Sequence, residues 1–241
     1  MDILQKIFDN KPEIKEQYNY LYSYYKNSFE RKEKDKDQIN RVSFVSEIRF
    51  GYYLHNRFEN LEYDPNVSGK TPDWVVDSNF EKIIFEVKQL NPNNNIFEER
   101  INQVKADKYY GEGKLKGVYG IGDIFPYLTK IMEKEKIYRD LILDGRYKLV
   151  ICINFSNLLD EFFTDNDLID YLDLKNNYNF FRHTIEYLDI NNFNNFCNNV
   201  SGFLVIPRFG SDIFFIENKM SANKLSSETI EKLNKTFLIS K

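Results

Sequence analysis

The 241-residue sequence is poor in cysteine and histidine, with two residues of each, and it contains no long apolar run. Cys152 and Cys197 cannot build a disulfide framework, and without a CxxC pair or further histidines we expect no zinc site. The longest apolar stretches, such as residues 149–153, fall far short of the roughly 20 residues of a membrane-spanning helix. Residues 1–13 carry acidic side chains and lack the apolar core of a secretory signal. These absences predict a cytoplasmic protein without a membrane segment.

Neither sign of charge dominates, because 33 lysines and arginines are matched by 37 aspartates and glutamates, giving a formal net charge of −4. This balance excludes a protein that coats polyanions through its overall field, so a nucleic acid would have to bind a local patch. The run at residues 30–37 alternates in sign and is interpreted as a solvated helix surface or connection without a functional role. The best candidate patch lies in residues 101–150 and comprises Lys105, Lys108, Lys114, Lys116, Lys130, Lys134, Lys136 and Arg139.

Hydrophobic periodicity predicts helices alternating with strands, and a hydrophobic fraction of 42% is enough to build a core. This order predicts an α/β domain in which helices flank a central mixed β-sheet. Three parts are expected: an N-terminal helical extension (1–39), a core (40–155), and C-terminal helices plus a hairpin packed on the same domain (156–241). The expected helices cover residues 12–29, 40–57, 96–110, 124–143 and 226–236, with further short helices in 156–200. The expected strands cover residues 58–64, 74–76, 83–87, 147–155, 203–208 and 213–217.

The strands at 74–76 and 83–87 are predicted to form a hairpin that turns at residues 79–80. That turn places Asp73 opposite Glu86. Directly opposed residues lie about 4.5–5.5 Å apart, and two carboxylates at that distance destabilise a sheet unless their charge is compensated. A divalent cation is a natural compensator, so the hairpin predicts a metal site.

Side chains alternate across a strand, so Glu86 and Lys88 are expected on one face of the hairpin and Gln89 on the other. Two carboxylates, the backbone carbonyl of Val87 and water molecules suit Mg²⁺, which prefers oxygen ligands. Beside such an ion, Lys88 could orient an attacking water or stabilise charge on a scissile phosphate. The alternative interpretation is a surface hairpin on which Glu86 and Lys88 form an ordinary solvated pair.

Pro72-Asp73, followed after twelve residues by Glu86-Val87-Lys88, resembles the motif of the PD-(D/E)XK nuclease superfamily. The order of elements is also similar, because a helix carrying Glu47 precedes a strand, the two motif strands and a further helix. The resemblance implies a restriction-endonuclease-like core over residues 40–155, with extra helical segments at both ends.

The resemblance also implies roles for the matching residues. Asp73 and Glu86 would bind Mg²⁺, for which Mn²⁺ could substitute, and Lys88 would help to activate water for phosphodiester hydrolysis. Glu47 matches an acid on the first core helix that ligates metal or water in this superfamily.

Four further residues are candidates for substrate binding. Lys70 is expected in a turn near Asp73, where it could contact a phosphate. Gln103, Lys105 and Lys108 belong to the helix expected after the motif, and such helices often face the substrate in related nucleases. For this helix, an ordinary solvated polar face is the alternative interpretation.

Together these features predict a Mg²⁺-dependent endonuclease that hydrolyses DNA, and the resemblance implies a role in restriction or a similar defence. A homodimer would supply the two active sites that cutting both strands requires. Two alternatives stay open: a nuclease that acts on RNA or on structured or single-stranded DNA, and a non-catalytic nucleic-acid-binding subunit that keeps the fold.

Overall fold

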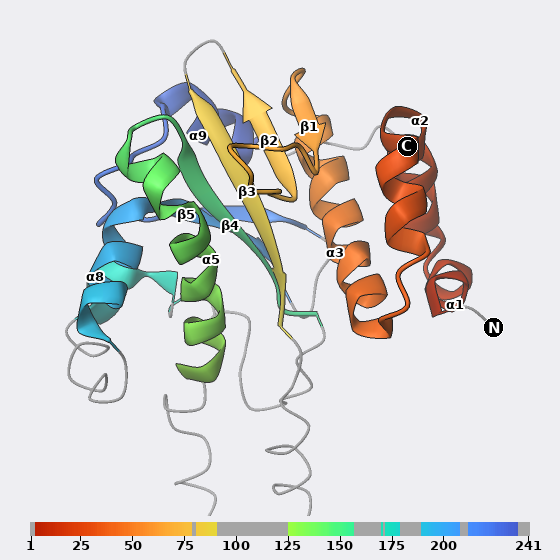
Figure 1. Cartoon of the computed structure of the whole chain (residues 1–241), viewed down its shortest axis with the longest axis horizontal. Coiled ribbons are helices and arrows are strands. Elements are labelled where there is room, and N and C mark those ends of the chain that lie inside the picture. Colours follow the sequence, from red (N-terminus) through yellow and green to blue (C-terminus); the bar gives the residue numbers. More distant parts are fainter. Residues whose placement is uncertain are drawn as a thin grey trace, which may run out of the picture.

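The computed structural model describes residues 3–78, 81–90, 125–156, 170, 172–178, 189–207 and 212–235. Within these ranges, six strands form one mixed sheet with helices on both faces (Figure 1). This arrangement confirms the predicted α/β class with a central mixed sheet flanked by helices. The strands are β1 (Leu61–Tyr63), β2 (Trp74–Asp77), β3 (Lys82–Gln89), β4 (Lys148–Asn154), β5 (Val200–Ile206) and β6 (Phe214–Glu217). The helices are α1 (Ile3–Asn10), α2 (Pro12–Glu33), α3 (Gln38–His55), α5 (Phe125–Leu143), α8 (Ile190–Asn199) and α9 (Ser227–Asn234).

The strands lie in the sheet in their order along the chain. β1, β2 and β3 form an antiparallel meander, β3, β4 and β5 run parallel, and β6 returns antiparallel to β5. Parallel neighbours need a crossover connection, and α5 precedes β4 just as α8 precedes β5. The sheet is therefore antiparallel from β1 to β3 and parallel from β3 to β5.

The register of the β2–β3 hairpin agrees with the prediction. Trp74 pairs with Phe85, which puts Asp73, the residue before β2, level with Glu86 on β3. The backbone N–H of Ser78 donates to the carbonyl of Glu81 at 3.1 Å, as the same register requires. The predicted turn at residues 79–80 lies outside the described residues.

Each face of the sheet packs against its own set of helices. On one face, Ile84 and Ile151 belong to a hydrophobic cluster with α5 and α8, while on the other face Trp74 and Val87 belong to a cluster with α1, α2 and α3. Figure 1 shows these two groups of helices on opposite sides of the sheet. The seven residues of β5 are all buried, which is typical of a strand covered on both faces.

Most expected elements are found with shifted ends. The helix expected at 12–29 runs on to Glu33, and the strand expected at 58–64 shortens to Leu61–Tyr63. Ser226 caps α9, with its Oγ accepting from the N–H of Thr229 at 3.2 Å. The helix expected at 96–110 lies outside the described residues. The three-part division of the chain stays a prediction, and the sheet continues from the second part into the third.

None of the helices in the described ranges combines the length and the apolar character that crossing a bilayer requires.

Candidate functional site

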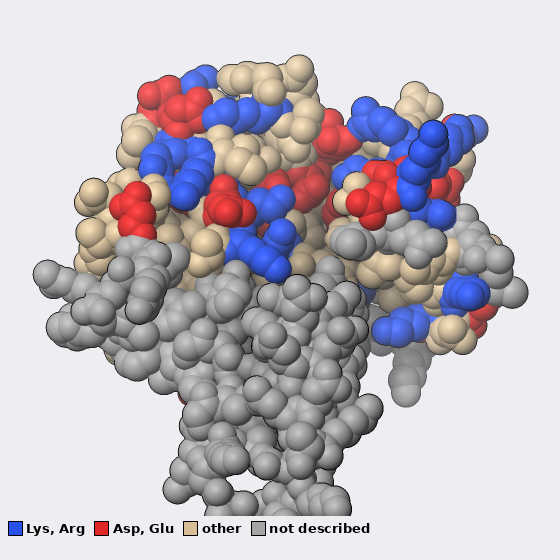
Figure 2. Space-filling view, turned by 60° about the horizontal axis from the view of Figure 1, so that its bottom comes forward, with Lys and Arg blue, Asp and Glu red and all other residues tan. Residues whose placement is uncertain are grey.

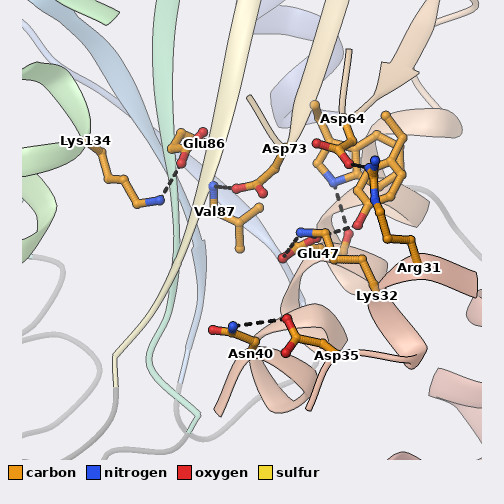
Figure 3. Close-up of polar contacts among 12 residues, drawn as sticks. Arg31, Lys32, Asp35, Asn40, Glu47, Asp64, Asp73, Glu86, Val87 and Lys134 are labelled. Carbon is orange, nitrogen blue, oxygen red and sulfur yellow. Dashed lines mark hydrogen bonds and ion pairs between the residues drawn. The ribbon is translucent and has the colours of Figure 1, made fainter. Parts of the chain in front are cut away.

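The end of the β2–β3 hairpin brings Asp73 next to the part of β3 that extends beyond its pairing with β2. Val87 lies beyond the last β2–β3 pair, so its N–H has no backbone partner on β2. The carboxylate of Asp73 takes that place and accepts the N–H of Val87 at 2.8 Å (Figure 3). The strand pairing thus fixes where this carboxylate lies, as backbone donors in a protein interior need a partner.

Glu86 is buried on the α5 face of the sheet, with 4% of the residue exposed. The Nζ of Lys134 contacts its Oε1, and the hydroxyl of Tyr138 donates to its Oε2 at 2.8 Å. Both partners stand on α5, one helical turn apart. A carboxylate with so little solvent needs such partners, because an isolated buried charge is strongly unfavourable.

Glu47 is buried on α3 and has an equivalent pair of partners. The Nζ of Lys32 lies 2.9 Å from its Oε2, to which the hydroxyl of Tyr63 donates at 2.5 Å. The indole N–H of Trp74 donates to the backbone carbonyl of Glu47 at 3.1 Å, tying α3 to the start of β2. Figure 3 shows Glu86 beside Lys134 on the α5 side and Glu47 beside Lys32 on the other side, with Asp73 between them.

The electrostatics of Asp73 link the two sides of this cluster. Burial raises the pKa of Asp73 well above its usual range, and the carboxylates of Glu47 and Glu86 raise it further. Lys134 and Lys32 act in the opposite direction. The three carboxylates lie on α3, directly before β2 and on β3, and they are close enough to interact, so a negative charge on Asp73 is unfavourable.

Lys88 is half-buried, and within the described ranges its side chain makes no ion pair or hydrogen bond. Burial lowers the pKa of Lys88, as do the nearby ammonium groups of Lys134 and Lys130. Since both lysines stand on α5, Lys88 lies on the same face as Glu86, as expected. Gln89 points to the other face, where its Oε1 accepts the hydroxyl of Ser46 on α3 at 2.8 Å.

The chemistry of this donor set fits a hard divalent cation, because it consists of carboxylate oxygens. Nevertheless, within the described ranges no group of three or more acidic, histidine or cysteine side chains is arranged to hold a metal. The reason is visible in the contacts: Glu47 and Glu86 are turned to lysine and tyrosine partners, and Asp73 is turned to Val87. The roles predicted for the Val87 carbonyl and for these carboxylates as metal ligands stay predictions.

The residues proposed for substrate binding have different outcomes. Lys70 lies in a short turn closed by backbone hydrogen bonds with Val67, and its Nζ contacts Asp140 on α5. Its predicted contact with phosphate stays a prediction. Gln103, Lys105 and Lys108 lie outside the described residues.

Sequence reasoning missed the partners of the two buried glutamates. Lys134 and Tyr138 are four residues apart on a helix, and this spacing could have suggested that they share a target. Lys32 belongs to the run 30–37, for which the sequence suggests no functional role, and this interpretation is incomplete because Lys32 contacts Glu47. Nothing in the local sequence connects Tyr63 with Glu47, since only the packing of β1 against α3 brings them together.

The surface around this end of the molecule carries both signs of charge. On the face shown in Figure 2, basic and acidic side chains are interspersed over the described part of the chain. This pattern agrees with the nearly balanced composition and gives no broad basic surface in the part that can be seen.

Comparison with known proteins gives no family assignment. No protein-family model matches this chain, and neither the curated proteins nor the solved structures include a significant match.

Proposed function

We propose that this protein is a divalent-metal-dependent nuclease that hydrolyses phosphodiester bonds, with DNA as its substrate. The proposal rests on the charge cluster at the end of the hairpin, where the pKa of Asp73 is raised by burial and by Glu47 and Glu86. A cation relieves such a concentration of negative charge. Perturbed groups of this kind are concentrated at functional sites, although structural ion pairs also perturb pKa values.

The arrangement of the chain supports a PD-(D/E)XK type of nuclease. The acid-bearing helix α3, the strand β1 and the two motif strands β2 and β3 follow one another in the order that the resemblance implies, and the next described strand, β4, runs parallel to β3. The proposed motif residues Asp73, Glu86 and Lys88 all stand where the meander ends.

In the proposed reaction, Asp73, Glu86 and the Val87 carbonyl would hold the metal, and Glu47 would assist from α3. Mg²⁺ would supply positive charge that stabilises the phosphate and favours ionisation of a water. Lys88, which has no ion-pair partner among the described residues, orients the attacking water or stabilises the developing charge. Because burial and neighbouring lysines lower the pKa of Lys88, its amine gives up a proton more readily than an ordinary lysine does.

The test is a cleavage assay with supercoiled plasmid, single-stranded DNA and RNA, each with Mg²⁺, Mn²⁺ or EDTA. We expect cleavage of plasmid with either metal, none in EDTA, and a loss of at least about 100-fold in Asp73→Asn and in Lys88→Met. Lys15→Met is the control with the same change of charge, since Lys15 is an exposed lysine on α2 outside the candidate basic patch, and it should cleave like the wild type.

Three results would redirect the proposal. Cleavage of RNA or single-stranded DNA alone would change the substrate. Cleavage that survives in both site variants would move the active site elsewhere. Binding without cleavage of any substrate would favour a non-catalytic nucleic-acid-binding subunit.

If the protein cuts both strands of a duplex, we propose that it does so as a homodimer. Sedimentation analysis of the active species tests this oligomeric state.

A further inference from the structure

Lys134 contacts the carboxylate of Glu86, which the proposed metal would need as a ligand. Both oxygens of Glu86 are engaged, Oε1 by the Nζ of Lys134 and Oε2 by the hydroxyl of Tyr138. The residue is 4% exposed, so water offers its carboxylate little alternative. Lys134 is therefore the cation that makes burial of Glu86 tolerable in the absence of a metal.

The two partners of Glu86 differ in what a metal would do to them. A carboxylate oxygen can accept more than one interaction, so Tyr138 can keep its hydrogen bond while Glu86 ligates a cation. An ammonium group at Oε1 cannot share that position with a divalent cation, because the two positive charges repel each other. Lys134 has a flexible stem, and 23% of its side chain is exposed, so its ammonium has a route towards solvent.

The charges that face Lys134 make this position sensitive to any added cation. Glu86 and Asp73 attract its ammonium, and so does Glu47 on α3, whereas Lys88 carries a like charge close by. A divalent cation bound among these carboxylates would repel the ammonium of Lys134 and compete with it for Glu86.

We propose that Lys134 is a resident counter-cation: its ammonium neutralises Glu86 until a divalent cation binds, and it then leaves Oε1 for solvent or a substrate phosphate. This inference rests on the proposed function, because it assumes that Glu86 is a metal ligand. Lys134 is in this view a positioning residue that competes with the metal and keeps the empty site folded.

The first test measures metal affinity without any cleavage. Ca²⁺ prefers the same oxygen ligands, and its binding can be followed by calorimetry and by the fluorescence of Trp74, the single tryptophan, which hydrogen-bonds to Glu47. We expect Lys134→Met to bind Ca²⁺ about tenfold more tightly than the wild type, a coupling of ordinary size. Lys136→Met, with the same charge change on the same helix, should bind like the wild type.

The second test uses the wild-type chain and does not depend on the folding of a variant. Lysines are acetylated briefly with an amine-selective reagent, with and without Ca²⁺, and the modified positions are quantified by mass spectrometry. We expect Lys134 to be modified severalfold faster with Ca²⁺, because its ammonium is released from Glu86, while Lys136 is modified at the same rate in both.

The outcomes separate this inference from the proposed function. Equal Ca²⁺ affinity in Lys134→Met and the wild type, or unchanged Lys134 labelling, would overturn the counter-cation role while metal-dependent cleavage by the wild type still stands. Absence of both divalent-ion binding and cleavage in the wild type would overturn the two proposals together.

Discussion

The buried glutamates illustrate how single residues make a charged cluster tolerable. Each of Glu47 and Glu86 has one lysine and one tyrosine as partners, so each carboxylate receives a full countercharge and a neutral donor. Removing one partner of such a pair usually destabilises a protein by about 3–5 kcal/mol, because the remaining charge is left buried. Lys32 and Lys134 therefore stabilise the buried, ionised forms of Glu47 and Glu86.

His55 is another residue whose ionisation depends on its surroundings. Its ring lies against those of Tyr20 and Tyr24, with centroids 5.2 and 4.5 Å away. Burial lowers the pKa of His55 below its ordinary value of 6.5. Below that ordinary value the unfolded chain binds the proton more readily than the folded chain, so folding stability falls as the pH decreases through this range.

We expect the free energy of unfolding to decrease between about pH 7 and about pH 5, and to decrease less in His55→Gln than in the wild type. Carboxylates contribute to both curves equally, so the difference between them isolates the histidine. Urea denaturation at a series of pH values measures it. If the two curves have the same slope, the His55 ring is not held in its neutral form by the tyrosines.

At the scale of elements, a close contact between α3 and β2 sets the position of Glu47. The Trp74 indole lies directly against Gly51, four residues after Glu47, where an added β-carbon would overlap its ring. The same indole donates to the Glu47 carbonyl. Gly51 thus allows α3 to approach the sheet, and this approach brings Glu47 near Asp73.

Gly51→Ala tests this contact. Alanine favours a helix by about 1 kcal/mol over glycine, whereas overpacking a core typically costs about 1–3 kcal/mol. Because Trp74 is fully buried and has no room to move away, we expect a net loss of stability of about 1–2 kcal/mol in urea denaturation followed by circular dichroism.

The double variant Gly51→Ala/Trp74→Phe is the control, since a smaller ring makes room for the methyl group. The cost of the alanine should be smaller in the background of the Trp74→Phe substitution, as a double-mutant cycle would show. An alanine that stabilises the wild-type background would mean that the helix and sheet separate easily at this point.

Local sequence predicts part of these elements and of the site. The motif hairpin could be placed in register from its turn alone, because antiparallel pairing is decided by the residues between the strands. The faces of Glu86, Lys88 and Gln89 followed from alternation. The partners of Glu86 could not be predicted, since Lys134 and Tyr138 reach it only through the packing of α5 on the sheet.

At the scale of the whole molecule, β5 joins the C-terminal part of the chain to the core. β5 pairs with both β4 and β6, and its residues are buried throughout. Without it, β4 would become an exposed apolar edge, which is a template for aggregation. The part of the chain that carries no motif thus completes the sheet on which the site stands.

Two truncations compare the ends of the chain. Removal of residues 200–241 is expected to abolish cooperative thermal unfolding and to cause aggregation, because it removes β5 and β6 and leaves β4 as an apolar edge. Removal of residues 1–10 takes away α1, which buries Leu4 and Phe8, and should lower stability by several kcal/mol, given roughly 1.5–3 kcal/mol for each buried side chain. Calorimetry measures the thermal unfolding of each truncated chain, and gel filtration measures its aggregation. A 1–199 fragment that unfolds cooperatively and is monodisperse would contradict the role of β5.

A buried polar network also joins elements from different parts of the chain. The hydroxyl of Ser46, next to Glu47, donates to Gln89 and accepts from the Nδ2 of Asn154 at 2.8 Å. α3, β3 and β4 are thereby joined one residue away from Glu47 and Lys88. Fully satisfied networks of this kind favour one arrangement of the core over its alternatives.

The sequence alone determined the class of fold, the approximate positions of most described elements, the hairpin register and the faces on which Glu86, Lys88 and Gln89 lie. These properties depend on neighbours along the chain, through periodicity, alternation and turns. The tertiary structure alone decided that Glu86 and Glu47 are each neutralised by a lysine and a tyrosine. Such pairings join residues from 15 to 52 positions apart, and only the packing of helices against the two faces of the sheet brings them into contact.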